Sequence, residues 1–128
     1  MAKYPLLRDP FESELEYFKM NPHVAGMATE DDRVIFNPYS KVIPKQSDSV
    51  YKNESARIQM RKSSERPDFQ LTQEQSEAFK NYGDIQDQRE TIAARSYAGD
   101  ESSGELTDEQ RKYIQRLVQM MQHNDESM

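Results

Sequence analysis

Helix start and stop signals divide this chain into short segments, and the positions of these signals constrain the fold more than any other feature. Residues typical of helix N-caps open five segments, and glycine or Asn-Pro follows three of them. The caps are Asp9, Ser47, Thr72, Asp84 and Thr107, and the stops are Asn21-Pro22, Gly83 and Gly99. Because each start is soon followed by a stop or by polar chain, short helices are expected.

The residues between the signals agree with this division. Helices are expected from Pro10 to about residue 21 and over residues 47–62, 73–82, 85–98 and 108–122. Two short runs, residues 24–29 and 33–36, flank the acidic turn at residues 30–32, and the second is rich in β-branched and aromatic residues. The predicted fold class is mainly α, with about five short helices and one small β-hairpin near residues 24–36.

The chain has little apolar material with which to stabilise such a fold. Only 34% of its 128 residues are hydrophobic and 31% are charged, whereas ordering the backbone costs about 1–2 kcal/mol per residue. Either a marginal helical domain or a subunit ordered by its partners would fit. The expected parts are an N-terminal docking helix (1–22), a central helical domain with the hairpin (23–98), and an acidic linker, C-terminal helix and polar tail (99–128).

Two absences narrow the compartment in which the protein is expected. The chain contains no cysteine, so it has no disulfide framework and no thiolate metal site. The first twenty residues hold no apolar run of signal-peptide length, and no window approaches a membrane span. An intracellular or particle-internal protein, not secreted by a signal peptide, is therefore predicted.

Residues 53–57, Asn-Glu-Ser-Ala-Arg, have the spacing of the zinc-peptidase motif H-E-x-x-H without either histidine. Arginine has no free lone pair for a metal, and the chain's two histidines, His23 and His123, are far apart. We therefore predict no metal, cofactor or catalytic residue. Glu54 and Arg57 are instead expected to form a structural ion pair, with Arg57 holding the loop at residues 37–38 or the loop at residues 65–69.

Apolar stripes on the first and last predicted helices are candidate docking surfaces. Phe11, Leu15 and Phe18 follow one another at helical spacing, and Leu117 and Met121 do so near the C-terminus. The first stripe can pack into the chain's own domain or against a neighbouring protein. Met120 and Met121 can form either an adaptable docking surface or ordinary core.

Residues 41–66 are basic within an otherwise acidic chain. They carry seven Lys or Arg against three acids, a net charge of +4, whereas the whole chain carries −6. Lys52, Arg61 and Lys62 are candidate phosphate contacts. The alternative is a solvated helix face whose cations pair with the acidic flanks.

The three adjacent acids at residues 30–32 lack the pattern of a calcium loop and are expected to form a solvated turn.

Four stretches of the sequence resemble a family of small, poorly characterised proteins of tailed bacteriophages and prophages. These stretches are "NPHVAGMATEDDRVIFNPYS", "NESARIQMR", "RPDFQLTQEQSEAFKNYG" and "RETIAAR". The family carries the same N-E-x-x-R arrangement, which makes the absent histidines normal. The resemblance implies a virion-associated protein of the tail, the portal region or the capsid interior.

Three functional hypotheses follow. The leading one is a non-enzymatic structural or interaction subunit, acting by protein–protein contacts in a virion or the host cytoplasm. The alternative is a small nucleic-acid-associated or regulatory protein that uses residues 41–66. An inactive relative of a metallopeptidase fold is the third, indicated only by the order of strand and helix around Glu54.

Overall fold

The computed structural model describes residues 3–127, with side chains through residue 123. These residues form five α-helices, one 3-10 helix (η1) and a two-stranded antiparallel sheet. In chain order the elements are α1 (Glu12–Met20), β1 (Gly26–Ala28), β2 (Val34–Phe36), α2 (Ser47–Lys62), α3 (Gln73–Ala78), α4 (Ile85–Tyr97), η1 (Glu101–Ser103) and α5 (Asp108–Ser127). The predicted fold class, mainly α with a small β-hairpin, is confirmed. No helix within the described residues is long and apolar enough to cross a membrane.

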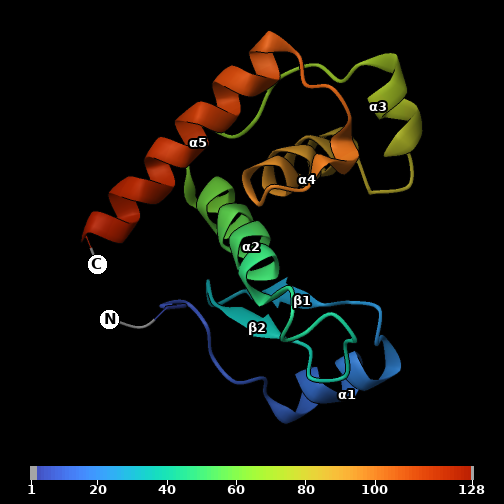
Figure 1. Cartoon of the computed structure of the whole chain (residues 1–128), viewed down its shortest axis with the longest axis vertical. Helices are drawn as coiled ribbons and strands as arrows, with labels where there is room; N and C mark the ends of the chain where they lie inside the picture. The colour runs from blue at the N-terminus through green and yellow to red at the C-terminus, as the bar shows by residue number, and fades with distance from the viewer. Residues whose placement is uncertain (1–2, 128) are drawn as a thin grey trace.

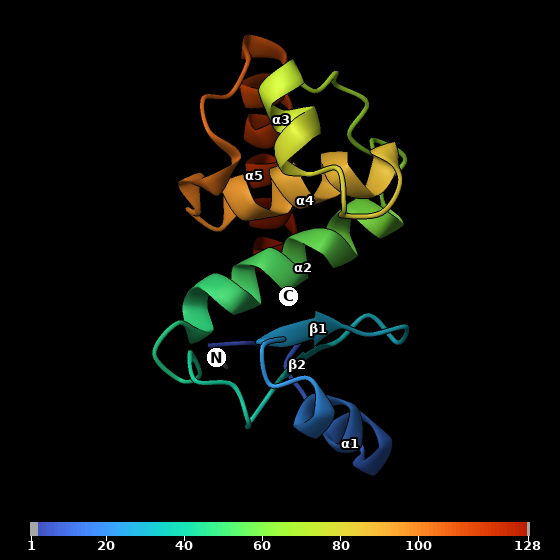
Figure 2. The same cartoon turned by 90° about the vertical axis from the view of Figure 1, so that its right-hand side faces the viewer.

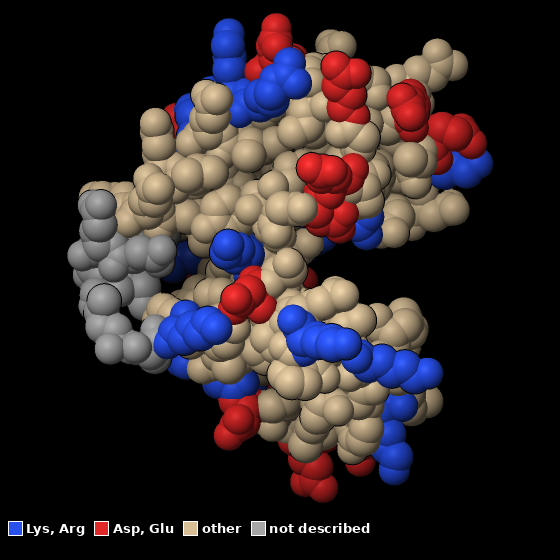
Figure 3. All heavy atoms as spheres, viewed as in Figure 1, with Lys and Arg blue, Asp and Glu red and all other residues tan. Residues whose placement is uncertain are grey.

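Helix α2 occupies the centre of the molecule (Figure 1). The hairpin packs against one side of α2, and α4 runs antiparallel to α2 along the opposite side (Figure 2). Helix α5 crosses this pair and contacts both helices. The space-filling view shows a notch between the half that contains α3 to α5 and the half that contains α1 and the hairpin (Figure 3).

The main hydrophobic core lies where α2, α4 and α5 meet. Its buried members are Ala56, Met60, Phe69, Phe79, Ile92, Ala93, Ala94, Tyr113, Leu117 and Met121. The last three residues of this set come from α5, so the C-terminal helix shares its core with the central segment of the chain. Burial of these apolar side chains is the main favourable term in the stability of this half.

A buried side chain and the hydrogen bonds of Asn37 attach α1 to the rest of the chain. Phe18, the one buried side chain of α1, is fully buried, as are Val34 and Ile35 of β2. The buried amide of Asn37 donates hydrogen bonds to the carbonyl oxygens of Phe18 (3.4 Å) and of two further residues near the end of the helix, and so holds the loop after β2 against α1. Helix α1 is therefore part of the folded body.

Gly26 lets β1 approach α2 closely. A Cβ atom at this position would lie 2.7 Å from Val50 Cγ1 on α2 and 3.0 Å from the carbonyl oxygen of Ile35 on β2. The first distance is shorter than packed atoms tolerate and the second is tighter than most packed contacts, so a larger residue would push the strand away from the helix or from its partner strand.

The two T-x-x-Q capping boxes meet inside the protein. Thr72 and Thr107 cap α3 and α5, and each accepts a hydrogen bond from the backbone N–H of the glutamine three residues later. The two glutamine side chains, Gln75 and Gln110, are buried and bond to each other reciprocally, with N–O distances of 2.9 and 2.7 Å. The recurrence of the motif thus produces a symmetric amide pair that ties the starts of two helices together.

Every hydrogen-bonding group of this amide pair has a partner. Each Oε1 also accepts from the backbone N–H of its own cap residue, at 3.0 Å for Gln75 and 3.1 Å for Gln110. The remaining amide hydrogens reach the carbonyl oxygens of Ser103 (3.4 Å) and Gln70 (3.0 Å). Such complete satisfaction is what allows two polar amides to remain buried.

Several element ends differ from those predicted. The predicted start of the first helix at Asp9-Pro10 is wrong, because Phe11 is the N-cap and Glu14 accepts its N–H at 2.7 Å. Helix α3 ends at Ala78, with a turn before the next cap, Asp84. The predicted acidic linker after residue 99 contains η1. Helix α5 continues to Ser127, five residues past its predicted end, because no glycine or proline stops it.

Candidate functional site

Glu54 and Arg57 form the predicted pair at a small cavity beside α2. Arg57 Nε lies 3.7 Å from Glu54 Oε1, which is an ion-pair contact but too long for a hydrogen bond. The cavity, of about 310 Å³, lies between the start of β1 and the C-terminal end of α4, and Arg95 and Asp100 also line it. Acidic and basic side chains are therefore balanced there.

Burial dominates the electrostatics of this pair. Only 15% of the Glu54 side chain is exposed, and burial raises the pKa of its carboxyl to about 6, although the charge of Arg57 acts in the opposite direction. The guanidinium therefore does not fully compensate for the hydration that the carboxylate has lost.

The predicted contacts of Arg57 with the loops are wrong. Arg57 donates hydrogen bonds to Asn53 Oδ1 (3.0 Å) and to Thr91 Oγ1 on α4 (3.4 Å), so it joins α2 to α4. The loop at residues 65–69 is held by other residues. These are Arg89, which bonds to the Phe69 carbonyl, Gln86, which bonds to the Pro67 carbonyl, and Tyr113, which bonds to the Glu65 carbonyl.

Substitution of Glu54 by glutamine should remove part of the pH dependence of stability. The folded state retains the Glu54 proton to about pH 6, whereas the ordinary pKa is 4.5. This stabilising contribution is complete below pH 4.5 and is lost as the pH rises through 6. The free-energy difference between Glu54→Gln and the parent should therefore shift in favour of the variant by about 2 kcal/mol from pH 4 to pH 7.5.

Urea unfolding of both proteins at the two pH values measures this shift. Comparison with the parent at each pH cancels the titration of all other groups. A free-energy difference that stays constant between the two pH values would show that Glu54 does not titrate as its burial requires.

A larger cleft follows the other open side of α2. Its volume is about 680 Å³, and it lies between α2, the N-terminal segment, the last turn of α4 and the C-terminal half of α5. Lysines, tyrosines and apolar side chains line it together, including Lys3, Lys52, Lys62, Tyr4, Tyr51, Tyr97, Leu6, Ile58 and Met121. Two of the three candidate phosphate contacts, Lys52 and Lys62, therefore lie in one cleft.

Arg61, the third candidate phosphate contact, is engaged within the protein. Its Nη2 donates to the carbonyl oxygen of Thr29 (2.7 Å) and to Asp32 Oδ1 (2.8 Å). These bonds attach the hairpin turn to the C-terminal half of α2. For Arg61 the alternative prediction, a cation paired with an acidic flank, describes the structure.

Of the five candidate docking residues, only Phe11 is largely exposed. Its exposed fraction is 59%, whereas Phe18 and Leu117 are fully buried, Met121 is 9% exposed and Leu15 is half-buried. Partner docking by Phe18, Leu117 and Met121 is therefore wrong for the folded chain, since the chain's own core covers these side chains.

Two apolar side chains on the solvent side of α1 escaped the sequence analysis. Met20 is 82% exposed and Tyr17 is 47% exposed. Their spacing of three residues places them on one face of the helix. This spacing could have predicted an exposed apolar face at Tyr17 and Met20. The stripe that contains Phe18 predicted the opposite face as the docking surface.

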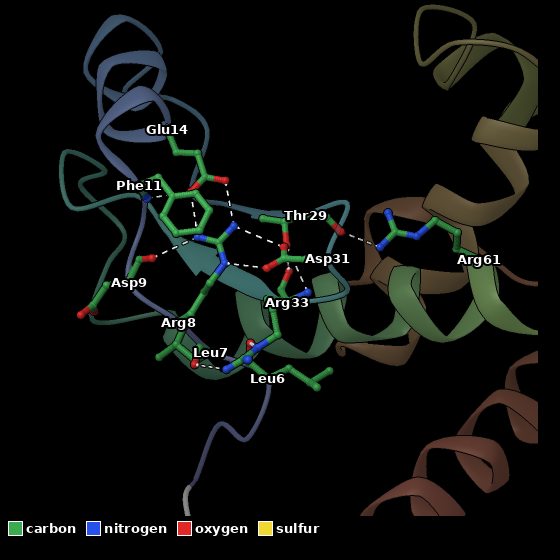
Figure 4. A network of polar contacts seen from close by, with 10 residues as sticks. All are labelled: Leu6, Leu7, Arg8, Asp9, Phe11, Glu14, Thr29, Asp31, Arg33 and Arg61. Carbon is green, nitrogen blue, oxygen red and sulfur yellow. Dashed lines mark hydrogen bonds and ion pairs between the residues drawn. The ribbon is translucent and has the colours of Figure 1, made fainter.

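Arg8 organises a polar network that the sequence also did not reveal (Figure 4). Its guanidinium bonds to both carboxylate oxygens of Glu14 (2.8 and 3.0 Å), to Asp31 in the hairpin turn (3.1 Å), and lies over the ring of Phe11 at 4.0 Å. Thr29 Oγ1 also donates to Asp31, and these two contacts lower the pKa of Asp31 to about 2. Two of the three acids predicted to form a solvated turn are thus engaged: Asp31 is tied through Arg8 to Glu14 of α1, and Asp32 is bonded to Arg61 of α2.

These features define a class of protein: a small, mainly α chain with two cavities flanking its central helix. Within the described part of the chain, no group of three or more histidine, aspartate or glutamate side chains is arranged to hold a metal ion. No protein-family model, curated protein or solved structure matches the sequence or the fold significantly.

Proposed function

We propose that the protein is a non-enzymatic structural or interaction subunit of a bacteriophage particle, present in the virion or the host cytoplasm. The observation that carries this proposal is the exposed apolar face of α1, formed by Tyr17 and Met20 (47% and 82% exposed). The helix lies at one end of the molecule, where a second protein can reach it (Figure 1). The sequence resemblance to small phage proteins supports the same assignment.

The residues around this face indicate the chemistry of the partner's binding surface. Two acids, Glu12 and Glu16, and one cation, Lys19, are exposed on the same helix, and Phe11 is exposed at its start. A matching surface would offer an apolar depression bordered by lysine or arginine side chains, because charged groups at an interface rim select partners of opposite charge. The partner in this proposal is therefore another protein subunit with a basic rim.

Co-expression with the proteins encoded by neighbouring genes tests the proposal. We expect a stable complex with at least one of them, detected by light scattering on a sizing column. The variant Tyr17→Ser/Met20→Ser should bind that partner at least tenfold more weakly, since exposed aromatic and methionine side chains contribute strongly to interfaces. Circular dichroism should show that this variant melts as the parent does.

The matched control is Tyr82→Ser/Ile85→Ser, because these residues are 45% and 49% exposed and lie on the other half of the molecule. This variant should retain the partner. Equal loss of binding in both double variants, or the absence of a complex with every neighbouring gene product, would refute docking through α1.

A further inference from the structure

The cleft on the Lys52 side of α2 has the shape of a groove for an extended chain. Lys52, Ser55, Gln59 and Lys62 line it from α2, and their spacing of three, four and three residues places them on one stripe of the helix. Residues 3–6 form the facing wall, and Tyr97 and Met121 contribute from α4 and α5. The two lysines therefore mark points ten residues apart along one groove.

The charges in this groove leave an excess of positive charge. Asp48 accepts a hydrogen bond from the Tyr4 hydroxyl and lies 3.4 Å from Lys3 Nζ, so its charge is engaged. Asp32 Oδ1 lies 2.8 Å from Arg61 Nη2, whereas Asp32 Oδ2 lies 3.9 Å from Lys62 Nζ. Among the described residues, no carboxylate lies within ion-pair distance of Lys52. Lys52 therefore lacks an acidic partner among these residues, and Lys62 shares Asp32 with Arg61 in a longer, exposed ion pair that contributes little. Both ammonium groups can therefore contact an anionic ligand, although the net charge of the chain is −6.

The length of the groove and its aromatic side chains narrow the class of ligand. Ten residues of helix span about 15 Å, which equals about four stacked nucleotides of one strand. Tyr4, Tyr51 and Tyr97 line the same cleft as the lysines. Lysines that contact phosphates, together with aromatic rings that contact bases, are the combination by which proteins bind single-stranded nucleic acid. The sequence lacks this interleaving, and the fold creates it.

We infer that this cleft binds single-stranded nucleic acid, with the phosphate backbone between Lys52 and Lys62 and the bases toward the tyrosines. An acidic peptide would satisfy the lysines but would make no specific use of the aromatic rings, so the nucleic acid is the better match. This site is independent of the α1 docking face, because it lies against α2 and the N-terminal segment.

Fluorescence anisotropy of a labelled strand of about twelve thymidines tests the inference. The parent should bind with an affinity that falls as salt rises. In Lys52→Gln/Lys62→Gln the slope of log affinity against log salt should decrease in magnitude by about 1.4, because two phosphate contacts are lost. Its affinity at about 100 mM salt should fall by an order of magnitude or more.

The control Lys41→Gln/Lys45→Gln carries the same change in charge and lies in the same basic segment, but neither residue lines the cleft. All four lysines are exposed, so neither variant removes a core contact. The control should bind as the parent does. Absence of binding by the parent, equal weakening in the two variants, or displacement of the strand by poly-glutamate at equal charge concentration would overturn the inference.

Discussion

Replacement of Gln110 by alanine should lower the free energy of unfolding by about 3 kcal/mol or more. Gln110 is fully buried, and its amide bonds to Gln75, to the Gln70 carbonyl and to the Thr107 N–H. Alanine would leave these groups buried without partners and would open a cavity between the starts of α3 and α5. Urea unfolding followed by circular dichroism measures the loss.

Two further variants distinguish the loss of this amide pair from a general loss of stability in α5. Gln115→Ala changes an exposed glutamine on the same helix and should alter stability by no more than about 0.5 kcal/mol. The double variant Gln75→Ala/Gln110→Ala should lose clearly less than the sum of the two single losses, since each single change strands the other amide. Additive losses would show that the two glutamines do not act as a pair.

Phe18→Ala should destabilise the isolated chain by about 3–5 kcal/mol. The Phe18 ring is fully buried, as are Val34 and Ile35 of the hairpin. Its removal would detach the one buried side chain of α1 from the rest of the protein. Thermal and urea unfolding of the purified chain, without any partner, measures the effect.

Phe11→Ala is the natural comparison because it makes the same change in a phenylalanine that is 59% exposed. This ring lies 4.0 Å from the Arg8 guanidinium, a contact that contributes about 0.5–1 kcal/mol at an exposed site. The loss should therefore stay near 1 kcal/mol. If the Phe18 variant were as stable as the Phe11 variant, Phe18 would not be a core residue, and the prediction that it docks a partner would stand again.

The elements that could be predicted from the sequence are those whose signals are local. Thr72 and Asp84 bond to backbone N–H groups three residues away, and the helices begin where these side chains predict. The span of α2, residues 47–62, was likewise correct, but the predicted cap Ser47 is wrong, because Gln46 is the N-cap and its side chain makes no capping hydrogen bond. The start of α1 was not, because Arg8 and Asp31 lie 23 positions apart and their pairing helps to place the entry into the helix.

The candidate sites depend almost wholly on contacts between distant segments. Lys52 and Lys62 could be selected by charge, but Arg61 could be separated from them only once its hydrogen bonds to Asp32 and to the Thr29 carbonyl were known. The cleft joins residues 3–6 with α2 and with Tyr97 and Met121, which no spacing rule connects. Burial of Glu54 is the exception, because Val50 and Ile58 on the same helix face favour a partly buried pair, and 15% of the Glu54 side chain is exposed.

The reciprocal amide bond between Gln75 and Gln110 has a consequence for synthesis on the ribosome. A growing chain that ends before residue 107 can form α2 and α4, but it lacks the Gln110 amide that pairs with Gln75 and the aromatic and aliphatic side chains that α5 adds to the core. Co-translational folding of this half must therefore wait until the last helix has left the exit tunnel. Nascent chains truncated there would expose the surfaces that chaperones and proteases recognise, so quality control can distinguish finished molecules from unfinished ones.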